Sequence, residues 1–274
     1  MWIKQYLALP DTMRKKGVDA FIYIMQMQGK AYRDVGIRKT IQVIIEGKSY
    51  FIKQHFGVGW REIFKNLFSF KQPILSAITE VNAIQKLEDI GIATTPLVGY
   101  GVKGKNPATL QSFIITEDLG NIISLEDLCA DWKNNPPAEK FKRKIIIEVA
   151  SIARKLHEYG INHRDFYLCH LCLDADLLAK NEIKFYLIDL HRVLIHKSIS
   201  TSDNMKDIAA LYFSSMGIGL TTRDLLRFKM HYLPESLLAN GFWQAVESRA
   251  NKLYKKFHSD KFQQRLAAEK SAIL

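Results

Sequence analysis

Two aspartates at the ends of recognisable segments constrain this chain more than any other feature. Asp165 ends the run Gly160-Ile161-Asn162-His163-Arg164-Asp165, and Asp189 follows it by 24 residues within the apolar run Phe185-Tyr186-Leu187-Ile188-Asp189-Leu190. A His-Arg-Asp loop after a helix can hold a carboxylate that accepts a proton from a hydroxyl group. An aspartate that closes an apolar strand can hold the magnesium ion that bridges ATP phosphates. The spacing leaves room for a short β-hairpin, so the pair predicts a catalytic loop for phosphoryl transfer.

The composition fits a globular protein with a large core. The chain has 274 residues, of which 47% are hydrophobic and 24% charged, and no stretch approaches the ~20 apolar residues that a membrane-spanning helix needs. Residues 1–16 lack the apolar core of a signal peptide, so we expect a cytoplasmic protein. The net charge of +11, part of it in residues 248–274, favours a polyanionic partner: nucleic acid, nucleotide phosphates or an anionic membrane.

The three cysteines fit a reducing compartment and exclude a disulfide scaffold. Cys169-His170-Leu171-Cys172 has the spacing of half a zinc site, but a tetrahedral site needs a second pair, which the sequence lacks. We therefore interpret Cys129, Cys169 and Cys172 as small buried residues, the last two in the turn after the catalytic loop.

The first half of the chain predicts an antiparallel sheet with one main helix. Two β-rich runs flank Glu46-Gly47-Lys48, where the glycine supplies a hairpin turn, and the second run ends at Lys53. Apolar residues at helical spacing follow, and Gly91 stops that helix. The expected order is hairpin 41–53, helix 73–89, strand 95–100 and strand 112–116, which is the layout of a kinase small lobe.

The strand pattern breaks at Glu117-Asp118-Leu119-Gly120, where we place a lobe boundary. A short helix is expected at 125–132, a longer one from Pro136 to Tyr159 with Gly160 as its cap, and helices after Asp203. The predicted fold is α+β and bilobal, like that of protein kinases. Residues 1–119 form a small lobe with an antiparallel β-sheet and an inserted glycine-, tryptophan- and base-containing segment near 55–70. Residues 120–274 form a mainly helical large lobe with a basic C-terminal helix.

The order of polar residues along the chain fits an ATP site. Lys53 can neutralise phosphate oxygens, and Glu80 on the following helix can pair with Lys53 and hold it in place. Glu117, at the lobe boundary, joins the expected nucleotide site. Taken singly, a strand lysine or a helix glutamate is more often a surface residue. In this order, together with Asp165 and Asp189, they support one another.

Each residue of the catalytic loop has an expected role. Asp165 is the base that accepts or orients the acceptor proton, Arg164 braces the loop, and His163 packs in its core. His170 stands where kinases place an asparagine for metal. Magnesium prefers oxygen ligands, so an imidazole leaves open whether this position contacts metal, whereas Asp189 is the better ligand. Asp207 is expected to cap backbone donors near the loop, which is a structural role.

A phosphate-cradling glycine loop is not evident. Gln28-Gly29-Lys30-Ala31-Tyr32-Arg33 lacks repeated glycines, and Lys30, with Arg33, Arg38 and Lys39, can substitute positive charge for them. Residues 55–67 alternate aromatic residues, glycines and bases. This segment is either an amphipathic helix on the small lobe or a flap that covers a sugar acceptor.

The sequence resembles the lipopolysaccharide core heptose kinases over nearly its whole length. The resemblance rests on residues 57–67 (GVGWREIFKNL), 160–170 (GINHRDFYLCH), 188–192 (IDLHR) and 206–213 (KDIAALYF). It implies a protein-kinase-like fold, and it makes His170 part of the pattern. It also implies ATP-dependent phosphorylation, with Mg²⁺, of the first inner-core heptose at its 4-hydroxyl group.

The resemblance further implies a location and partners. The acceptor is lipid A-core at the cytoplasmic face of the inner membrane of a Gram-negative bacterium, where an anionic surface suits the net charge of +11. We expect a peripheral protein on that face. No base-reading motif is recognisable, so nucleic acid is not an expected partner. A basic surface could also capture a small acidic protein such as acyl carrier protein.

Two other function classes stay open. A protein kinase, or a kinase of small molecules such as aminoglycoside antibiotics, would differ in the acceptor, and residues 57–67 favour the core saccharide. A basic binding module on a degenerate kinase fold is the non-enzymatic alternative. The presence of Lys53, Glu80, Asp165 and Asp189 together argues against it.

Overall fold

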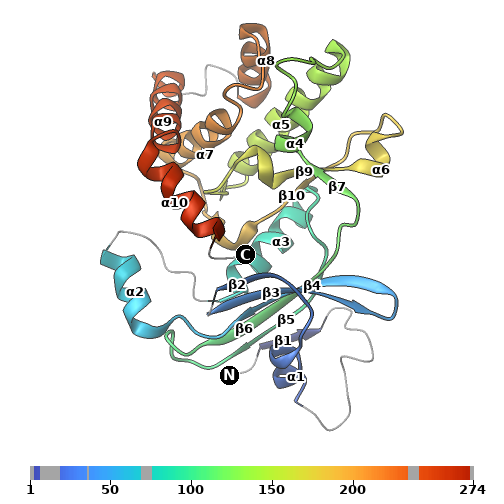
Figure 1. The fold of residues 1–274 in the computed structure, drawn as a ribbon, viewed down its shortest axis with the longest axis vertical. Helices are drawn as coiled ribbons and strands as arrows, with labels where there is room; N and C mark the ends of the chain where they lie inside the picture. The colour runs from blue at the N-terminus through green and yellow to red at the C-terminus, as the bar shows by residue number, and fades with distance from the viewer. Residues whose placement is uncertain (1–2, 7–18, 36, 69–75, 234–240, 272–274) are drawn as a thin grey trace. The chain divides into compact units, whose positions relative to one another are not determined.

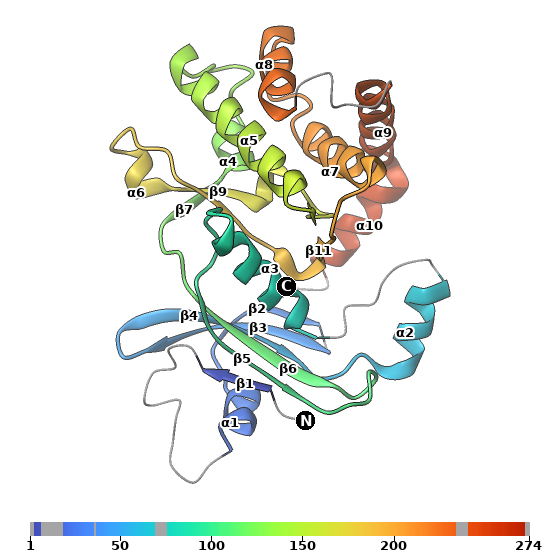
Figure 2. The ribbon, with the colours of Figure 1, turned by 180° about the vertical axis from the view of Figure 1, so that it is seen from behind.

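The fold is known from a computed structural model that describes residues 3–6, 19–35, 37–68, 76–233 and 241–271. The chain forms two compact units: Met1–Ile122 with Tyr186–Val193, and Ile123–Phe185 with Leu194–Leu274. All of 120–274 was expected in the large lobe, whereas residues 186–193, which contain Asp189, group with the first unit. The expected α+β architecture, with an antiparallel sheet and a mainly helical part, is confirmed (Figures 1 and 2).

The first unit is built on a six-stranded antiparallel sheet in the order β1-β5-β6-β4-β3-β2. Its strands are β1 (Ile3–Tyr6), β2 (Lys30–Val35), β3 (Arg38–Ile45), β4 (Lys48–His55), β5 (Leu97–Lys103) and β6 (Gln111–Glu117). The helical elements of this unit are α1 (Ala20–Gln26), α2 (Gly59–Phe68), α3 (Ile78–Asp89) and the 3-10 turn η3 (Leu190–Arg192).

The β3–β4 hairpin turns where the sequence predicted it. Ile45 pairs with Lys48, so the loop has two residues, Glu46 and Gly47, with φ of 52° and 76°. Two positive φ values match the right-handed twist of the flanking strands, which favours glycine in the loop. The register set by this turn continues to Arg38↔His55, so it fixes which β4 side chains share a face.

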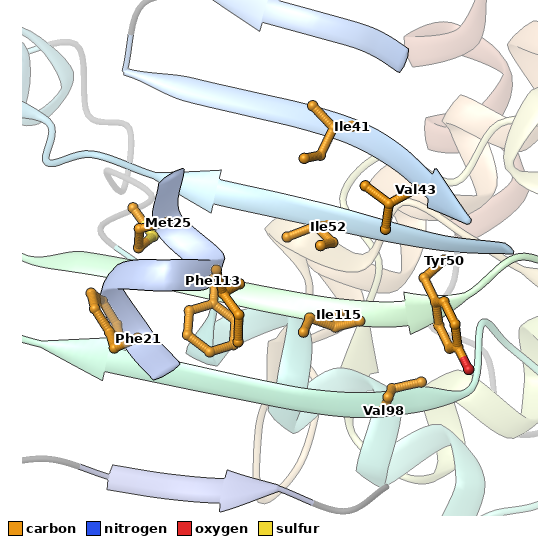
Figure 3. Packing of buried hydrophobic residues seen from close by; sticks show 10 residues of the cluster. Phe21, Met25, Ile41, Val43, Tyr50, Ile52, Val98, Phe113 and Ile115 are labelled. Atoms are coloured by element: carbon orange, nitrogen blue, oxygen red, sulfur yellow. The ribbon is translucent and has the colours of Figure 1, made fainter. Parts of the chain in front are cut away.

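One face of the sheet packs on α1 to form the core of the first unit (Figure 3). Phe21 of α1 lies with its ring 5.4 Å from that of Phe113 on β6, and Ile41 and Ile52 beneath are fully buried. Gln54 points to the same side, where its amide donates to the Ile24 carbonyl at 2.7 Å. Burial of each large aliphatic side chain contributes about 1.5–3 kcal/mol to folding, so the packing of α1 on this face stabilises the first unit.

The opposite face carries α3 (Figures 1 and 2). The helix begins at Ile78, where Ser112 Oγ accepts from the backbone N–H of Ala77 at 3.0 Å. Pro73, the predicted start of this helix, lies outside the described residues. The predicted end at Asp89 is confirmed.

The second unit is mainly helical. Its helices are α4 (Leu125–Cys129), α5 (Glu139–Glu158), α6 (Ala175–Leu178), α7 (Thr201–Ser214), α8 (Thr222–Tyr232), α9 (Phe242–Phe257) and α10 (Asp260–Ser271), with a 3-10 turn η2 (Leu168–His170). Short strands form a sheet β10-β9-β7 and a pair β11-β8. They are β7 (Ile122–Ser124), β8 (Ile161–Asn162), β9 (Leu171–Asp174), β10 (Phe185–Leu187) and β11 (Leu194–Ile195). The division between the units falls within β7 and within β10.

Helix α5 is the buried spine of the second unit. Its apolar face is buried and includes Ile145, Val149 and Leu156 at helical spacing. Lys142 on the same helix pairs with Asp224 of α8 at 2.8 Å and donates to the Gly219 carbonyl at 3.0 Å. No described helix combines the length and the apolar character needed to cross a membrane.

Candidate active site

The alternation of β4 places Lys53 on the α3 side of the sheet. Successive strand residues point to opposite faces, so Ile52 enters the core under α1 while Lys53 faces α3. There Lys53 Nζ lies 2.5 Å from Oε1 of Glu80 in the first turn of α3. Glu80 is only 3% exposed, so little water reaches its carboxylate, and Lys53 balances the negative charge. The structure thus brings together the lysine and the glutamate that the sequence analysis paired.

A cavity of about 230 Å³ opens beside this ion pair within the first unit. Ten polar residues line it, and five of them are charged: Tyr32, Arg38, Lys39, Thr40, Lys53, Gln54, His55, Glu80, Asp189 and His191. Three permanent cations there face two carboxylates, which leaves a surplus of positive charge. Such a surplus suits the phosphate chain of a nucleotide.

Asp189 reaches this cavity because the chain around it is fastened to the first unit. The Leu187 backbone N–H donates to the Ala93 carbonyl at 2.9 Å, and Thr94 Oγ1 donates to the Leu187 carbonyl at 2.6 Å. Asp189 then adopts a left-handed backbone with φ of 61°, and its Oδ1 contacts Nδ1 of His191. A strained residue of this kind persists only where its surroundings fix it.

The donor chemistry at Asp189 fits a magnesium ion. The carboxylate is about one-third exposed and lines the cavity with Lys53. The described residues contain no cluster of three or more His, Cys, Asp or Glu side chains that could cage a metal. Magnesium in phosphoryl-transfer sites needs no such cage, because one or two carboxylates, water and the substrate phosphates complete its shell.

Two of the sequence-predicted nucleotide residues lie elsewhere in the first unit. Lys30 begins β2 and sits 5.2 Å from the Tyr32 ring centroid, and Glu117 ends β6 as an exposed residue; neither lines the cavity. Arg38 and Lys39 on β3 line it instead. The proposed substitution of charge for a glycine loop therefore rests on these two bases, while the Arg33 side chain lies outside the described part.

His55 is a cavity residue that the sequence analysis did not single out. Burial lowers the pKa of His55, and the charges of Arg38 and Lys53 and the nearby His191 lower it further, to about 4. His55 is therefore a neutral imidazole at neutral pH and adds a hydrogen-bonding group without further positive charge. Its position two residues after Lys53 on one strand face was the signal in the sequence.

In the second unit, Asp207 holds the backbone of the loop that was predicted to be catalytic. This buried residue of α7 accepts from the backbone N–H of His163 at 2.7 Å and from that of Arg164 at 2.8 Å. Arg164 has a φ of 70°, a conformation that such paired hydrogen bonds help to hold. The predicted capping role of Asp207 is confirmed, and Asp207 lies within α7, which begins at Thr201.

The loop also fixes His170. The backbone carbonyl of Asp165 accepts from Nδ1 of His170 at 2.7 Å, and it accepts from the Tyr167 backbone N–H at 2.9 Å. With Nδ1 as donor, Nε2 is the ring nitrogen able to act as an acceptor or ligand. Cys129 and Cys172 are buried as predicted, and burial raises the pKa of each thiol. Cys169, also predicted to be buried, is only partly buried.

Comparison with known proteins identifies the family. The sequence model of the lipopolysaccharide kinase (Kdo/WaaP) family matches residues 23–232. The lipopolysaccharide core heptose(I) kinase WaaP of Escherichia coli (strain K12) is 47% identical over 218 residues, which cover 79% of this chain and 82% of that protein. The protein of the same name from Pseudomonas aeruginosa is 39% identical over 258 residues, covering 91% and 96%.

A solved structure agrees with this assignment. The structure of WaaP in complex with acyl carrier protein superposes with a TM-score of 0.78 at 35% identity, covering 93% of this chain and 99% of that chain. The predicted resemblance and the kinase-like fold are thereby confirmed. The chain belongs to the lipopolysaccharide kinase (Kdo/WaaP) family.

Proposed function

We propose that this protein transfers the γ-phosphoryl group of ATP to the 4-hydroxyl group of the first inner-core heptose of lipopolysaccharide. The observation that carries the proposal is the Lys53–Glu80 pair at 2.5 Å beside a basic cavity that also contains Asp189. Together with membership of a lipopolysaccharide kinase family, this chemistry favours a sugar kinase over a binding module.

On the donor side, Lys53 binds phosphate oxygens and Glu80 holds its ammonium group in one orientation. Arg38 and Lys39 add charge for the remaining oxygens, and the neutral His55 can donate a hydrogen bond. Asp189 would hold magnesium, which neutralises charge that develops on the phosphate oxygens. Asp118, the residue after β6, accepts from the Gln42 side chain at 2.7 Å.

On the acceptor side, Asp165 takes the proton of the sugar hydroxyl as the oxygen attacks phosphorus. Its backbone is held from both sides: Asp207 binds the preceding amides, and His170 binds the Asp165 carbonyl. A fixed loop keeps the carboxylate in position during transfer, so little reorganisation is needed at the moment of reaction.

The acceptor is tested with purified protein, γ-labelled ATP and four acceptors: delipidated core oligosaccharide from a strain lacking this protein, the intact lipid-linked core, a generic protein-kinase substrate and kanamycin. We expect label on the two core acceptors alone. Transfer to the protein or the aminoglycoside, with none to the core, would assign the acceptor to another class.

Acyl carrier protein is proposed as a partner, because it accompanies the related WaaP structure. Two features support the proposal: the net charge of +11 suits a small acidic protein, and the second unit contains an apolar cavity. This cavity of about 90 Å³ has Trp132, Ile146, Phe228 and Trp243 among its lining residues. An apolar cavity of this kind suits part of an acyl chain.

Binding is measured by titrating the purified protein with acyl carrier protein in its unacylated and acylated forms. We expect tighter binding of the acylated form, and loss of that preference in Ile146→Asp, which places a charge in the cavity. Equal binding of both forms by the unaltered protein would remove the cavity from the interaction.

We propose that the reaction takes place at the inner face of the inner membrane, because the proposed acceptor is lipid-linked. We propose peripheral association there, driven by exposed bases of α9 and α10, among them Lys252, Lys255, Lys256 and Lys261. Attraction of this type acts over about 8 Å at physiological ionic strength, so added salt should weaken it.

A further inference from the structure

Helix α2 starts in a fixed direction from the end of the sheet. After β4 ends at His55, Gly57 and Gly59 adopt φ of 95° and 72°, and a Cβ on Gly57 would lie 2.9 Å from the Ala108 carbonyl oxygen. That carbonyl instead accepts from the Gly59 backbone N–H at 2.9 Å. The first turn of α2 is thus attached to the β5–β6 loop, and Figures 1 and 2 show the helix extending beyond that end of the sheet.

The outer face of α2 is aromatic. Trp60 and Phe64 lie one turn apart with stacked rings, 5.8 Å between centroids and 27° between planes, and each is 50% exposed. Ile63 between them is 5% exposed and faces inward. Two large rings are therefore held together on the surface with half of each in water, which is an unfavourable arrangement for an isolated protein.

Two bases of the same region are exposed to solvent. Arg61 on the same helix is exposed, and so is Lys105 in the β5–β6 loop that contacts the first turn of α2. The helix sequence GWREIFKNLF contains two bases and one acid. Aromatic residues on one side with bases beside them characterise helices that lie in the membrane interface, where the rings enter the acyl boundary and the bases contact headgroup phosphates.

We infer that α2 docks on an anionic phospholipid bilayer, with Trp60 and Phe64 inserted at the interface and Arg61 and Lys105 on the headgroups. The inference deepens the proposed function, because it rests on a lipid-linked acceptor at the membrane surface. It adds an apolar contact that survives salt, in contrast to the purely electrostatic attraction of α9 and α10. A flap over the sugar acceptor is the competing role for the same residues.

Co-sedimentation of the full chain with vesicles tests the inference. The vesicles contain phosphatidylethanolamine with phosphatidylglycerol, or phosphatidylcholine alone. Trp60→Ser/Phe64→Ser should bind the anionic vesicles at least about ten-fold more weakly, since both exposed half-rings lose their apolar contact with lipid. The matched control is Ile44→Ser/Met230→Ser, which removes two side chains that are each 78% exposed elsewhere on the chain. The control should bind as the parent does.

Depth of insertion is read separately with brominated lipid, which quenches tryptophan fluorescence on contact. The parent should be quenched on anionic vesicles and Trp60→Phe much less so, although its vesicle binding changes little. Unchanged quenching in Trp60→Phe, or unchanged binding of the double serine variant, would overturn the inference.

Activity distinguishes docking from a flap and from failure of the proposed function. The double serine variant should phosphorylate delipidated core oligosaccharide as fast as the parent and membrane-embedded acceptor several-fold more slowly. Equal slowing on both acceptors would contradict docking and assign α2 to the acceptor site. Absence of transfer to any core acceptor by the parent would refute the proposed function alone, because vesicle binding and quenching are measured without ATP.

Discussion

The hydroxyl group of Tyr232, at the end of α8, lies 2.6 Å from Nδ1 of His157 on α5, and both side chains are buried. His157 Nε2 lies 3.4 Å from Oδ2 of Asp207, the carboxylate that holds the catalytic loop. Burial and the Asp207 charge both raise the pKa of Tyr232, so the phenol stays protonated and donates to the imidazole. Through His157, α8 is connected to the loop that carries Asp165.

Tyr232→Phe should therefore loosen the loop without opening a cavity. Losing this donor leaves His157 Nδ1 unsatisfied, which costs about 1–3 kcal/mol of unfolding free energy. We expect kcat to fall several-fold while KM for ATP stays close to that of the parent, because the phosphate-binding cavity is untouched. The measurements are urea unfolding and steady-state kinetics, with Tyr254→Phe as a half-exposed control. A change in KM alone would contradict this connection.

Variants of the Lys53–Glu80 pair can distinguish the effect of this ion pair on stability from its effect on catalysis. Lys53→Met should leave a buried carboxylate unpaired and lower the unfolding free energy by about 1–3 kcal/mol, since Lys53 itself is partly exposed. Lys53→Met/Glu80→Gln should recover most of that loss, because no unpaired charge remains. Both variants should lose phosphoryl transfer by at least about 100-fold, because neither holds the phosphates.

Unfolding free energy and phosphoryl transfer are measured for both variants and compared. Restored stability with absent activity is the expected combination. If either variant transferred phosphate as well as the parent, the ATP site would lie away from Lys53.

Arg38 and Lys30 distinguish two accounts of phosphate binding. Arg38 lines the cavity and Lys30 does not, so Arg38→Gln should raise KM for ATP by about ten-fold while Lys30→Gln has a smaller effect. Initial rates at varied ATP concentration give both values. A larger increase in KM for ATP in Lys30→Gln than in Arg38→Gln would mean that the segment around Gly29 binds the phosphates.

His55 gives the folded protein a specific pH dependence. Its pKa falls from 6.5 to about 4 on folding, so the unfolded chain binds the extra proton between these values. The unfolding free energy should therefore decrease as pH falls from 6.5 to 4, by an amount on the order of 3 kcal/mol from this residue. Denaturant unfolding across that range should show a smaller decrease in His55→Gln. Identical pH profiles would mean that His55 is not buried as a neutral imidazole.

Local chemistry explains which parts of the fold were predictable. The β3–β4 hairpin followed from one glycine between two β-rich runs, and its register carried Lys53 to the α3 face. Helix α5 followed from its apolar spacing and ends at Glu158, two residues before Gly160. A Cβ at Gly160 would lie 2.2 Å from the His196 carbonyl oxygen, so no side chain fits there. In both cases a short stretch of sequence contained the whole signal.

Long-range partners explain what was missed. Strand β2 has no clear apolar alternation, and it lies at the edge of the sheet, where β3 is its neighbour among the described strands. The contacts of His157 with Tyr232 and Asp207 span 75 and 50 residues, so no local pattern reveals them. The grouping of Asp189 with the first unit depends on the hydrogen bonds of Leu187 to Ala93 and Thr94. Such pairings come from tertiary structure rather than from spacing.

The most direct test of the central claim, a sugar kinase with Asp165 as its base, is the turnover of Asp165→Asn. Its kcat for transfer from γ-labelled ATP to delipidated core oligosaccharide should fall by a factor on the order of 10²–10⁴, with KM for ATP nearly unchanged and the fold intact by circular dichroism. Asp176→Asn, an exposed position on α6, should leave kcat unchanged. Turnover close to that of the parent in folded Asp165→Asn would contradict the account.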